Sequence, residues 1–162
     1  MNELLVMARI AGRRAAFRAV EIHSVIEIEG ISPVPRAPDF ITGLTAMRSR
    51  SLTVIDCRKS LGLAVETAPG VRAAVVEVEG HLYALQVDQV EDVAEARSAP
   101  EPVSGGLGDA WQRVSLGMVE TDDGPAVLIN VERMIAGPPA TQAARETGAA
   151  RKPGNEPIGV SA

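Results

Sequence analysis

The stretch VMARIAGRRAAFRA (6–19) recurs as AVVEVEGHLYALQV (74–87), and this duplication decides the fold. Both copies carry a glycine at the same place, Gly12 and Gly80, between two runs rich in apolar residues. Apolar positions with a period of two on either side of a turn glycine are typical of a β-hairpin. The positions expected to face inward match in pairs: Ala8 with Val76, Ile10 with Val78, Phe17 with Leu85, and Ala19 with Val87. The sequence therefore predicts two copies of one hairpin, offset by 68 residues.

A second unit is duplicated further along the chain. LTVIDCRKSL (52–61) recurs as AVLINVERMI (126–135), with Asp56 and Asn130 at the same place in each copy. Asp and Asn are equally good N-caps for the short helices expected at 57–61 and 131–135, so this interchange indicates structure and not catalysis. The order of units predicts two related β modules in tandem. Such a layout favours a scaffold with a groove between modules over a central catalytic pocket.

Length and composition narrow the class of protein. Each half of the 162 residues is too short to bury a sufficient core alone, so the seam between the halves is expected to carry apolar packing. The net charge of −5 argues against a nucleic-acid surface, which needs clustered Lys and Arg. Aromatic residues are too few for a base-stacking platform, so the core is expected to be aliphatic.

Residues that could perform chemistry are sparse. His23 and His81 stand apart from any other His or Cys at metal-ligand spacing, and the single cysteine, Cys57, lies in an apolar strand where an inert thiol is expected. Asp122-Asp123 precedes a glycine and reads as a tight turn, because no further calcium ligands follow. We expect no enzyme activity, no catalytic residue, no cofactor and no metal.

The ends of the chain carry two further expectations. Residues 1–10 read as a first strand and not as a signal peptide, and no apolar run approaches the ~18 residues of a membrane-spanning helix, so a cytoplasmic protein is expected. From Gly137 onward no periodic apolar face remains. The folded domain is therefore expected over residues 1–136, and residues 137–162 are expected to form a disordered tail.

Three local features bear on the site. In VIEIE (25–29) a period of two puts Ile26 and Ile28 on one face, and so Val25 and Glu27 on the other, outward face. A helical turn is expected at 39–42, followed by a hairpin of strands 44–48 and 51–57 that turns at 49–50. Residues 98–112, rich in Gly and Pro, are expected to form the longest internal loop.

These stretches together resemble the CheW-type coupling proteins of bacterial chemotaxis over residues 4–136. The resemblance lies in VIEIEG (25–30), PVPRAPDFITGLTAMR (33–48), LTVIDCRKSLGL (52–63), GHLYALQVDQVEDV (80–93) and AVLINVERMI (126–135). Each motif is weak alone, but their order and spacing are fairly specific. The resemblance implies an all-β fold of two five-stranded β barrels packed side by side, in agreement with the duplication. It also implies a non-enzymatic adaptor that joins the cytoplasmic tips of chemoreceptors to a histidine autokinase.

In that family a helical hairpin of the receptor lies in the groove between barrels. The positions that match its contact motif are Val25, Glu27, Gly43 and Arg48. The family usually has Asn and Gly where this chain has Ala46 and Ser49. These departures leave open an adaptor of a divergent chemosensory-like pathway with a non-motility output. A small β-barrel binding module or enzyme is a third reading, which would need a basic face or clustered polar residues.

Overall fold

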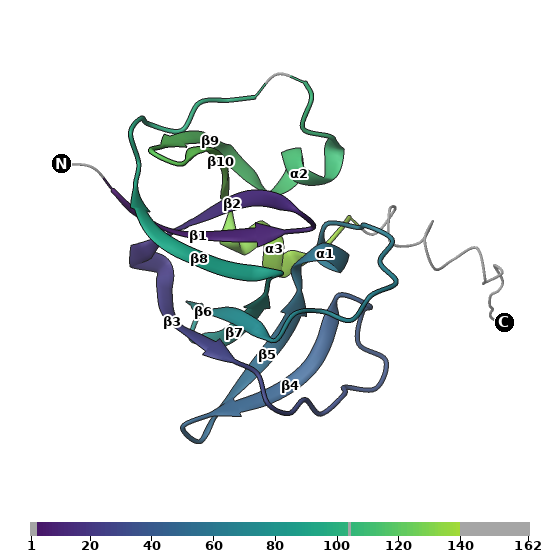
Figure 1. Ribbon diagram of the computed structural model, residues 1–162. Coiled ribbons are helices and arrows are strands. Elements are labelled where there is room, and N and C mark those ends of the chain that lie inside the picture. Colours follow the sequence, from purple (N-terminus) through teal and green to yellow (C-terminus); the bar gives the residue numbers. More distant parts are fainter. Residues whose placement is uncertain (1–2, 104, 140–162) are drawn as a thin grey trace, which may run out of the picture.

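Ten strands and four short helical segments make up the computed structural model, which describes residues 3–103 and 105–139 (Figure 1). One five-stranded sheet, sheet A, has the order β8-β1-β2-β10-β9 and contains β1 (Leu4–Ile10), β2 (Arg13–Arg18), β8 (Gln89–Glu95), β9 (Ser115–Thr121) and β10 (Gly124–Ile129). The other, sheet B, has the order β3-β6-β7-β5-β4 and contains β3 (Ile22–Glu27), β4 (Ile41–Met47), β5 (Arg50–Asp56), β6 (Arg72–Val78) and β7 (His81–Gln86). The helical segments are η1 (Ala19–Glu21), α1 (Cys57–Ser60), α2 (Asp109–Val114) and α3 (Val131–Ala136). The predicted all-β class with two five-stranded units side by side is confirmed.

The duplicated hairpins exist, but each lies in the sheet built mainly by the other half of the chain. The β1–β2 hairpin joins β8, β9 and β10, whereas the β6–β7 hairpin joins β3, β4 and β5. The two halves are therefore interleaved, and do not form two consecutive units. The physical reason lies in the parallel pairs β10 with β2 and β5 with β7, because parallel strands need a long crossover and take their partner from a distant segment. The register repeats too, since Val127 lies opposite Ala15 as Thr53 lies opposite Tyr83.

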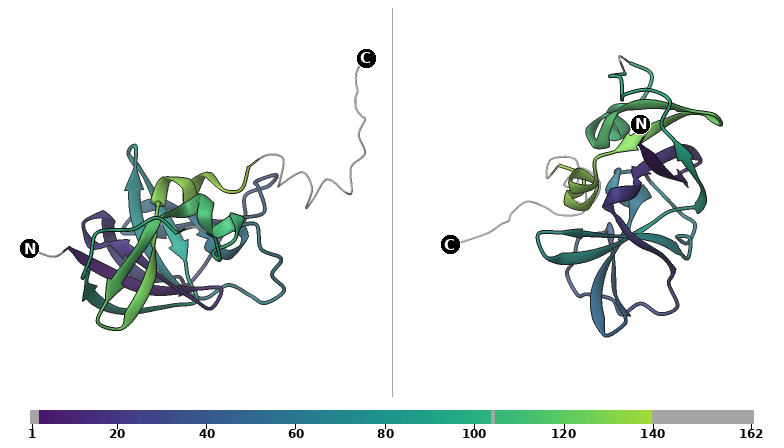
Figure 2. Two further views of the ribbon diagram at one scale, coloured as in Figure 1. Left: turned by 90° about the horizontal axis from the view of Figure 1, so that it is seen from above. Right: turned by 90° about the vertical axis from the view of Figure 1, so that its left-hand side faces the viewer.

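The apolar seam expected between the modules is the largest buried cluster of the molecule. Its members include Ile10, Phe17, Leu85 and Val127, all fully buried. All eight inward positions matched by the duplication either belong to this cluster or pack against it. Each curled sheet also has a smaller cluster on its inside, around Met7 in sheet A and around Leu52 and Val75 in sheet B. Figure 2 shows the two sheets as separate lobes that meet along this seam.

Each unit is an open sheet and not a closed barrel. In sheet B the edge strands β3 and β4 do not pair, and the segment that follows β3 reaches β4 through an isolated bridge of Ser32 with Leu44. Sheet A repeats this arrangement with an isolated bridge of Glu101 with Met118. The expected closed barrels are therefore not formed, and an isolated bridge in each unit takes the place of the continuous ladder that a barrel would have.

Local expectations were confirmed in part. Asp56 and Asn130 cap α1 and α3 as predicted, accepting from the backbone N–H of Arg58 at 3.0 Å and of Arg133 at 3.1 Å. The hairpin β4–β5 turns at Arg48-Ser49, one residue earlier than expected.

Two element assignments were wrong in part. The turn expected at 39–42 is present at Asp39 and Phe40, where Ile41 N–H donates to Pro38 O at 3.0 Å, but it ends there because Ile41 already pairs with Ile55 in β4. The loop expected over 98–112 contains the start of α2, which the burial of Trp111 and Val114 on one helical face stabilises. The tail expected over 137–162 lies beyond the described residues from residue 140 onward. Within the described part of the chain, no helix has the length and apolarity to cross a membrane.

Candidate protein-interaction surface

The outward face of β3 presents an apolar and a charged side chain to solvent. Burial alternates along the strand, so that His23, Val25 and Glu27 are exposed while the residues between them are half-buried. Val25 is 40% exposed, although it lies opposite the buried Ala74 in β6. The face assigned to Val25 and Glu27 from the period of two is therefore the exposed one.

The hairpin tip that carries Arg48 lies beside this strand. Ser24 Oγ lies 3.6 Å from Met47 Sδ, which places the end of β4 against the middle of β3. Among residues 3–103 and 105–139, no carboxylate lies within 4.0 Å of the Arg48 guanidinium, and Glu27 has no cationic partner at that distance. Both charges thus face solvent uncompensated, and we call Val25, Glu27 and Arg48 the β3 surface.

The turn at Arg48 has an unusual backbone. Arg48 has φ of 52° and Ser49 has φ of 70°, both in the left-handed region. A two-residue hairpin turn of the kind that matches strand twist requires positive φ at both central positions, and glycine, asparagine and aspartate adopt it most easily. The hairpin therefore keeps its tight turn without glycine, at a cost in backbone strain.

Gly43 is buried in β4 and offers no side chain to a partner. Its φ is 153°, and an added Cβ would lie 2.5 Å from both the backbone oxygen of Ser32 and Cγ2 of Ile31. The repeat has the same device, because Gly117 has φ of 124° and its Cβ would lie 2.8 Å from the oxygen of Glu101. The structure gives Gly43 a packing role under the bridging segment, and its assignment as a receptor contact stays a prediction.

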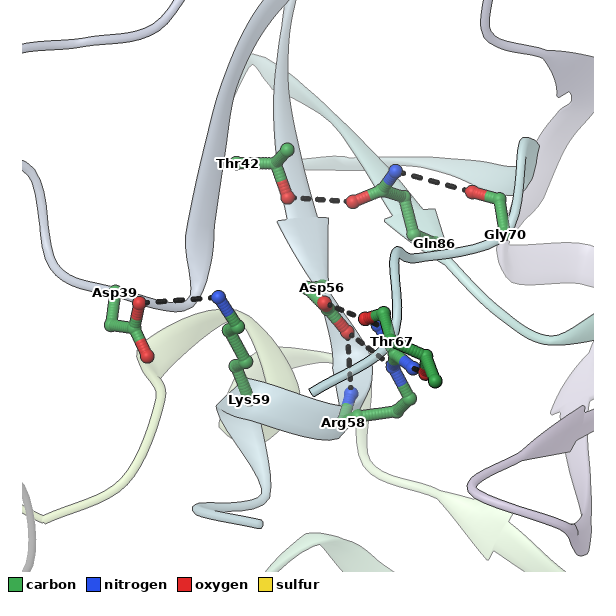
Figure 3. A network of polar contacts seen from close by, with 8 residues as sticks. All are labelled: Asp39, Thr42, Asp56, Arg58, Lys59, Thr67, Gly70 and Gln86. Atoms are coloured by element: carbon green, nitrogen blue, oxygen red, sulfur yellow. Dashed lines mark hydrogen bonds and ion pairs between the residues drawn. The ribbon is translucent and has the colours of Figure 1, made fainter. Parts of the chain in front are cut away.

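A polar network at α1 holds the long connection from α1 to β6, within sheet B (Figure 3). Arg58 donates to both carboxylate oxygens of Asp56 at 3.1 and 3.0 Å, and also to Oγ1 and O of Thr67 at 2.9 and 3.1 Å. Asp56 is 2% exposed, and its hydrogen bond raises the pKa of Arg58. Both oxygens of this carboxylate are occupied, so Asp56 serves structure.

The single cysteine, Cys57, is inaccessible to substrates. Cys57 is fully buried beside Asp56, and burial raises the pKa of its thiol far above neutrality. A thiol that stays protonated and inaccessible does not attack substrates. The expected burial of Cys57 is confirmed, although Cys57 is the first residue of α1 and does not lie in a strand as expected.

The sequence predicted a groove between the modules but not the residues that line it, and the structure has a groove of about 650 Å³ at the seam. It is lined by η1 and the start of β3, the β6–β7 turn, Leu116 of β9 and the start of α3. Val20 in its wall is 86% exposed and Leu116 is 39% exposed. The signal was present, since an apolar residue at the turn between two strands, as Val20 is, has no core to enter.

Comparisons with known proteins agree with this architecture. The family described as CheW-like domain matches residues 4–138. A protein of Thermotoga maritima named "Chemotaxis protein CheW" is 25% identical over 120 residues, which are 74% of this chain and 79% of that protein. The crystal structure of the scaffolding protein TtCheW from Thermoanaerobacter tengcongensis superposes with a TM-score of 0.68 at 26% identity, and covers 80% of this chain and 84% of that one.

Proposed function

The chain belongs to the CheW-like family, and we propose that it is a non-enzymatic adaptor that couples chemoreceptor tips to a histidine autokinase in bacterial chemotaxis. The relatives support a scaffold role, since one is named a chemotaxis protein and the other a scaffolding protein. The adaptor acts in the cytoplasm, where the signalling tips of chemoreceptors lie. Its partners are the helical tip of a receptor and the regulatory domain of the kinase.

The observation that carries this proposal is the uncompensated β3 surface. Val25 offers an exposed apolar contact, while Glu27 and Arg48 offer charges that no described residue neutralises. A partner helix with an apolar stripe flanked by charges fits such a surface, and this is a common mode of peptide recognition. Gly43 contributes to the receptor contact indirectly in this proposal, by holding β4 in place under the bridging segment.

One observation favours a second candidate function. Ala46 and Ser49 replace the residues usual in the family. Without glycine at position 49, the turn that carries Arg48 has a strained backbone with positive φ at Ser49. A partner other than a methyl-accepting receptor, in a chemosensory-like pathway with a non-motility output, is consistent with this altered tip. Binding of the kinase domain without binding of any receptor tip would favour this candidate.

The test is a pull-down with a receptor tip fragment and a kinase regulatory domain, each offered separately. Arg48→Glu should weaken receptor binding at least tenfold, because a hydrogen bond to a charged group contributes about 1.5–3 kcal/mol and the reversed charge repels the partner. Kinase binding and the melting temperature should stay unchanged.

Arg36→Glu is the matched control, since Arg36 is exposed and lies outside the β3 surface. It should leave both interactions intact. Unaltered receptor binding by Arg48→Glu would remove Arg48 from the site, and loss of folding would make it a structural residue. Failure of the unmodified chain to bind either partner would reject the adaptor function itself.

A further inference from the structure

We propose that the groove at the seam binds an extended, basic segment of a partner protein. None of the residues of the β3 surface lines this groove, so the inference goes beyond the proposed function and does not depend on it. It follows from the internal duplication, because the groove has a counterpart on the other side of the seam, and the chain's own connecting segment occupies part of that counterpart.

The register of the repeats identifies that counterpart. Residues 18, 20, 79 and 132 line the groove, and the two offsets relate them to Gln86, Asp88, Ala11 and Arg58. Ala11, Arg58 and Asp88 lie together around a second, smaller hollow. The other residues around that hollow, from 63 to 70, all belong to the segment that connects α1 to β6.

The connecting segment 62–71 therefore lies where the groove is open on the opposite side. Arg58 holds it through the hydrogen bonds to Thr67, and Gln86 Nε2 donates to the backbone oxygen of Gly70 at 3.2 Å (Figure 3). Gly70 approaches the backbone of Val87 so closely that a Cβ would collide with it. The protein thus shows, in one copy of the site, how an extended chain occupies it.

No described segment plays this part at the open groove. The position equivalent to the start of segment 62–71 follows α3, and there the chain departs at Gly137, which packs against the ring of Phe40. Only the first turn of α3, at Asn130, Val131 and Glu132, borders the groove. The described end of the chain therefore lies away from the groove, which favours a separate molecule as occupant.

Charge specifies the chemistry of that occupant. The arginine that clamps the filled site, Arg58, is replaced by Glu132 at the open one, and Glu21, Glu77 and Glu79 add three more carboxylates to its rim. Within the described residues none of these four carboxylates forms an ion pair. The lining has two basic residues, Arg18 and His23. Arg18 is already paired with Glu3 at 3.2 Å.

A lining of unpaired carboxylates with exposed apolar side chains among them is complementary to a chain that carries Lys or Arg beside small apolar residues. Val20 and Leu116 supply the apolar contacts, and the carboxylates supply the sign of charge. The occupant of the counterpart, GLAVETAPG (62–70), has these small apolar residues but an acidic one in the middle. The segment that fits the open groove has Lys or Arg at the position that Glu66 holds in segment 62–70.

A peptide titration followed by amide resonances of the full chain tests the proposal. The probe is the nonapeptide GLAVKKAPG, which is segment 62–70 with lysine in place of Glu66 and Thr67, and the control peptide is GLAVEEAPG. The lysine peptide should shift the amides of Val20, Glu79 and Glu132, whereas the glutamate peptide should leave them in place. Absence of a shift with the lysine peptide at millimolar concentration, or equal shifts with both peptides, would overturn the proposal.

Variants locate the binding site. Glu132→Gln should weaken binding of the lysine peptide up to about fivefold, the value of one partly exposed ion pair, and Glu132→Arg should abolish it. Glu29→Arg is the control, because Glu29 is exposed and does not line the groove. Equal binding by all three variants would place the peptide elsewhere and reject the groove. A shift of the same amides on changing Arg151 and Lys152 to Ser, without peptide, would make the occupant the chain's own C-terminal segment and reject a partner.

Discussion

Replacing Gly43 by alanine separates a packing role from a contact role, because the structure contains an internal control. The new Cβ would lie 2.5 Å from the backbone oxygen of Ser32, a distance that real side chains do not tolerate, at a φ of 153° that L residues rarely adopt. Ser32 belongs to the segment that bridges to β4, and its backbone exchanges two hydrogen bonds of 2.8 Å with Leu44. The alanine must therefore either strain the backbone or push the bridging segment away.

The magnitude follows from these two costs. A residue held in a sparsely populated backbone region costs about 1–3 kcal/mol. Weakening the two Ser32–Leu44 hydrogen bonds adds about 0.5–1.5 kcal/mol for each bond that is lost. If both bonds are lost, we expect Gly43→Ala to lower the free energy of unfolding by about 2–6 kcal/mol, which is a large part of the ~5–15 kcal/mol typical of a domain. The melting temperature should fall by roughly 4–24 °C.

Gly117→Ala is the matched control, since Gly117 holds the same place in sheet A and lies far along the chain from the predicted receptor contacts. Its Cβ would lie 2.8 Å from the oxygen of Glu101, so a comparable loss of stability is expected. The assay is thermal and urea unfolding of both variants beside the unmodified chain, together with receptor-tip binding at a temperature where all are folded. A Gly43→Ala variant that melts normally yet fails to bind the receptor tip would refute the packing argument and make Gly43 a direct contact.

Two further substitutions test the turn and the seam groove. Ser49→Gly should raise the free energy of unfolding by about 0.5–1 kcal/mol, because glycine adopts the φ of 70° without strain, and an unchanged or lower melting temperature would contradict the strained turn beside Arg48. Burial raises the pKa of Glu21, and the nearby carboxylates of Glu3 and Glu132 raise it as well. The folded state therefore binds the proton of the Glu21 carboxyl more tightly than the unfolded state does. The free energy of unfolding consequently declines as pH rises above 4.5. Glu21→Gln should therefore be more stable than the unmodified chain at neutral pH and no more stable below pH 4.5, and unfolding curves that differ equally at both pH values would show that the carboxyl does not titrate in this way.

The duplication predicted the apolar seam from the sequence because a hairpin has only two faces. Once Phe17 and Leu85 are aligned as inward residues, the period of two assigns every other residue of both hairpins. The exchange of hairpins between the sheets could not be predicted in this way. Both the exchanged and the tandem arrangement bury the same faces, and the choice between them depends on crossover connections that leave no local pattern in the sequence.

The candidate site was predicted unevenly for a similar reason. The exposure of Val25 and Glu27 follows from alternation within one strand, which is a local property. The proximity of Arg48 to β3 and the burial of Gly43 depend on a contact between edge strands that do not pair, and only the coordinates supply it. The lining of the groove could not be predicted either, because its residues come from four separate segments of the chain.

The repeat that builds the β3 surface also builds a near copy of it on sheet A. The alignment that relates Val6–Ala19 to Ala74–Val87 continues to the third strand of each module, where VIEIE (25–29) corresponds to VAEAR (93–97). Val93 is 59% exposed and Glu95 is exposed, so the copy presents the same pair of side chains in β8. A partner that contacted only the exposed valine and glutamate could bind to either sheet.

The charges at the two hairpin tips remove that ambiguity. Arg48 corresponds to Asp122, and Glu29 corresponds to Arg97, so the copy has the opposite arrangement of signs. In sheet A these charges neutralise each other, because Arg97 donates to both carboxylate oxygens of Asp122 at 2.8 and 2.7 Å and lowers the pKa of that carboxyl. In sheet B the described residues show no such pair, and Arg48 has no carboxylate within 4.0 Å. In the adaptor that we propose, this ion pair closes the tip in sheet A and leaves the tip in sheet B open to a partner's carboxylate, so that the duplicated fold presents one recognition surface and not two.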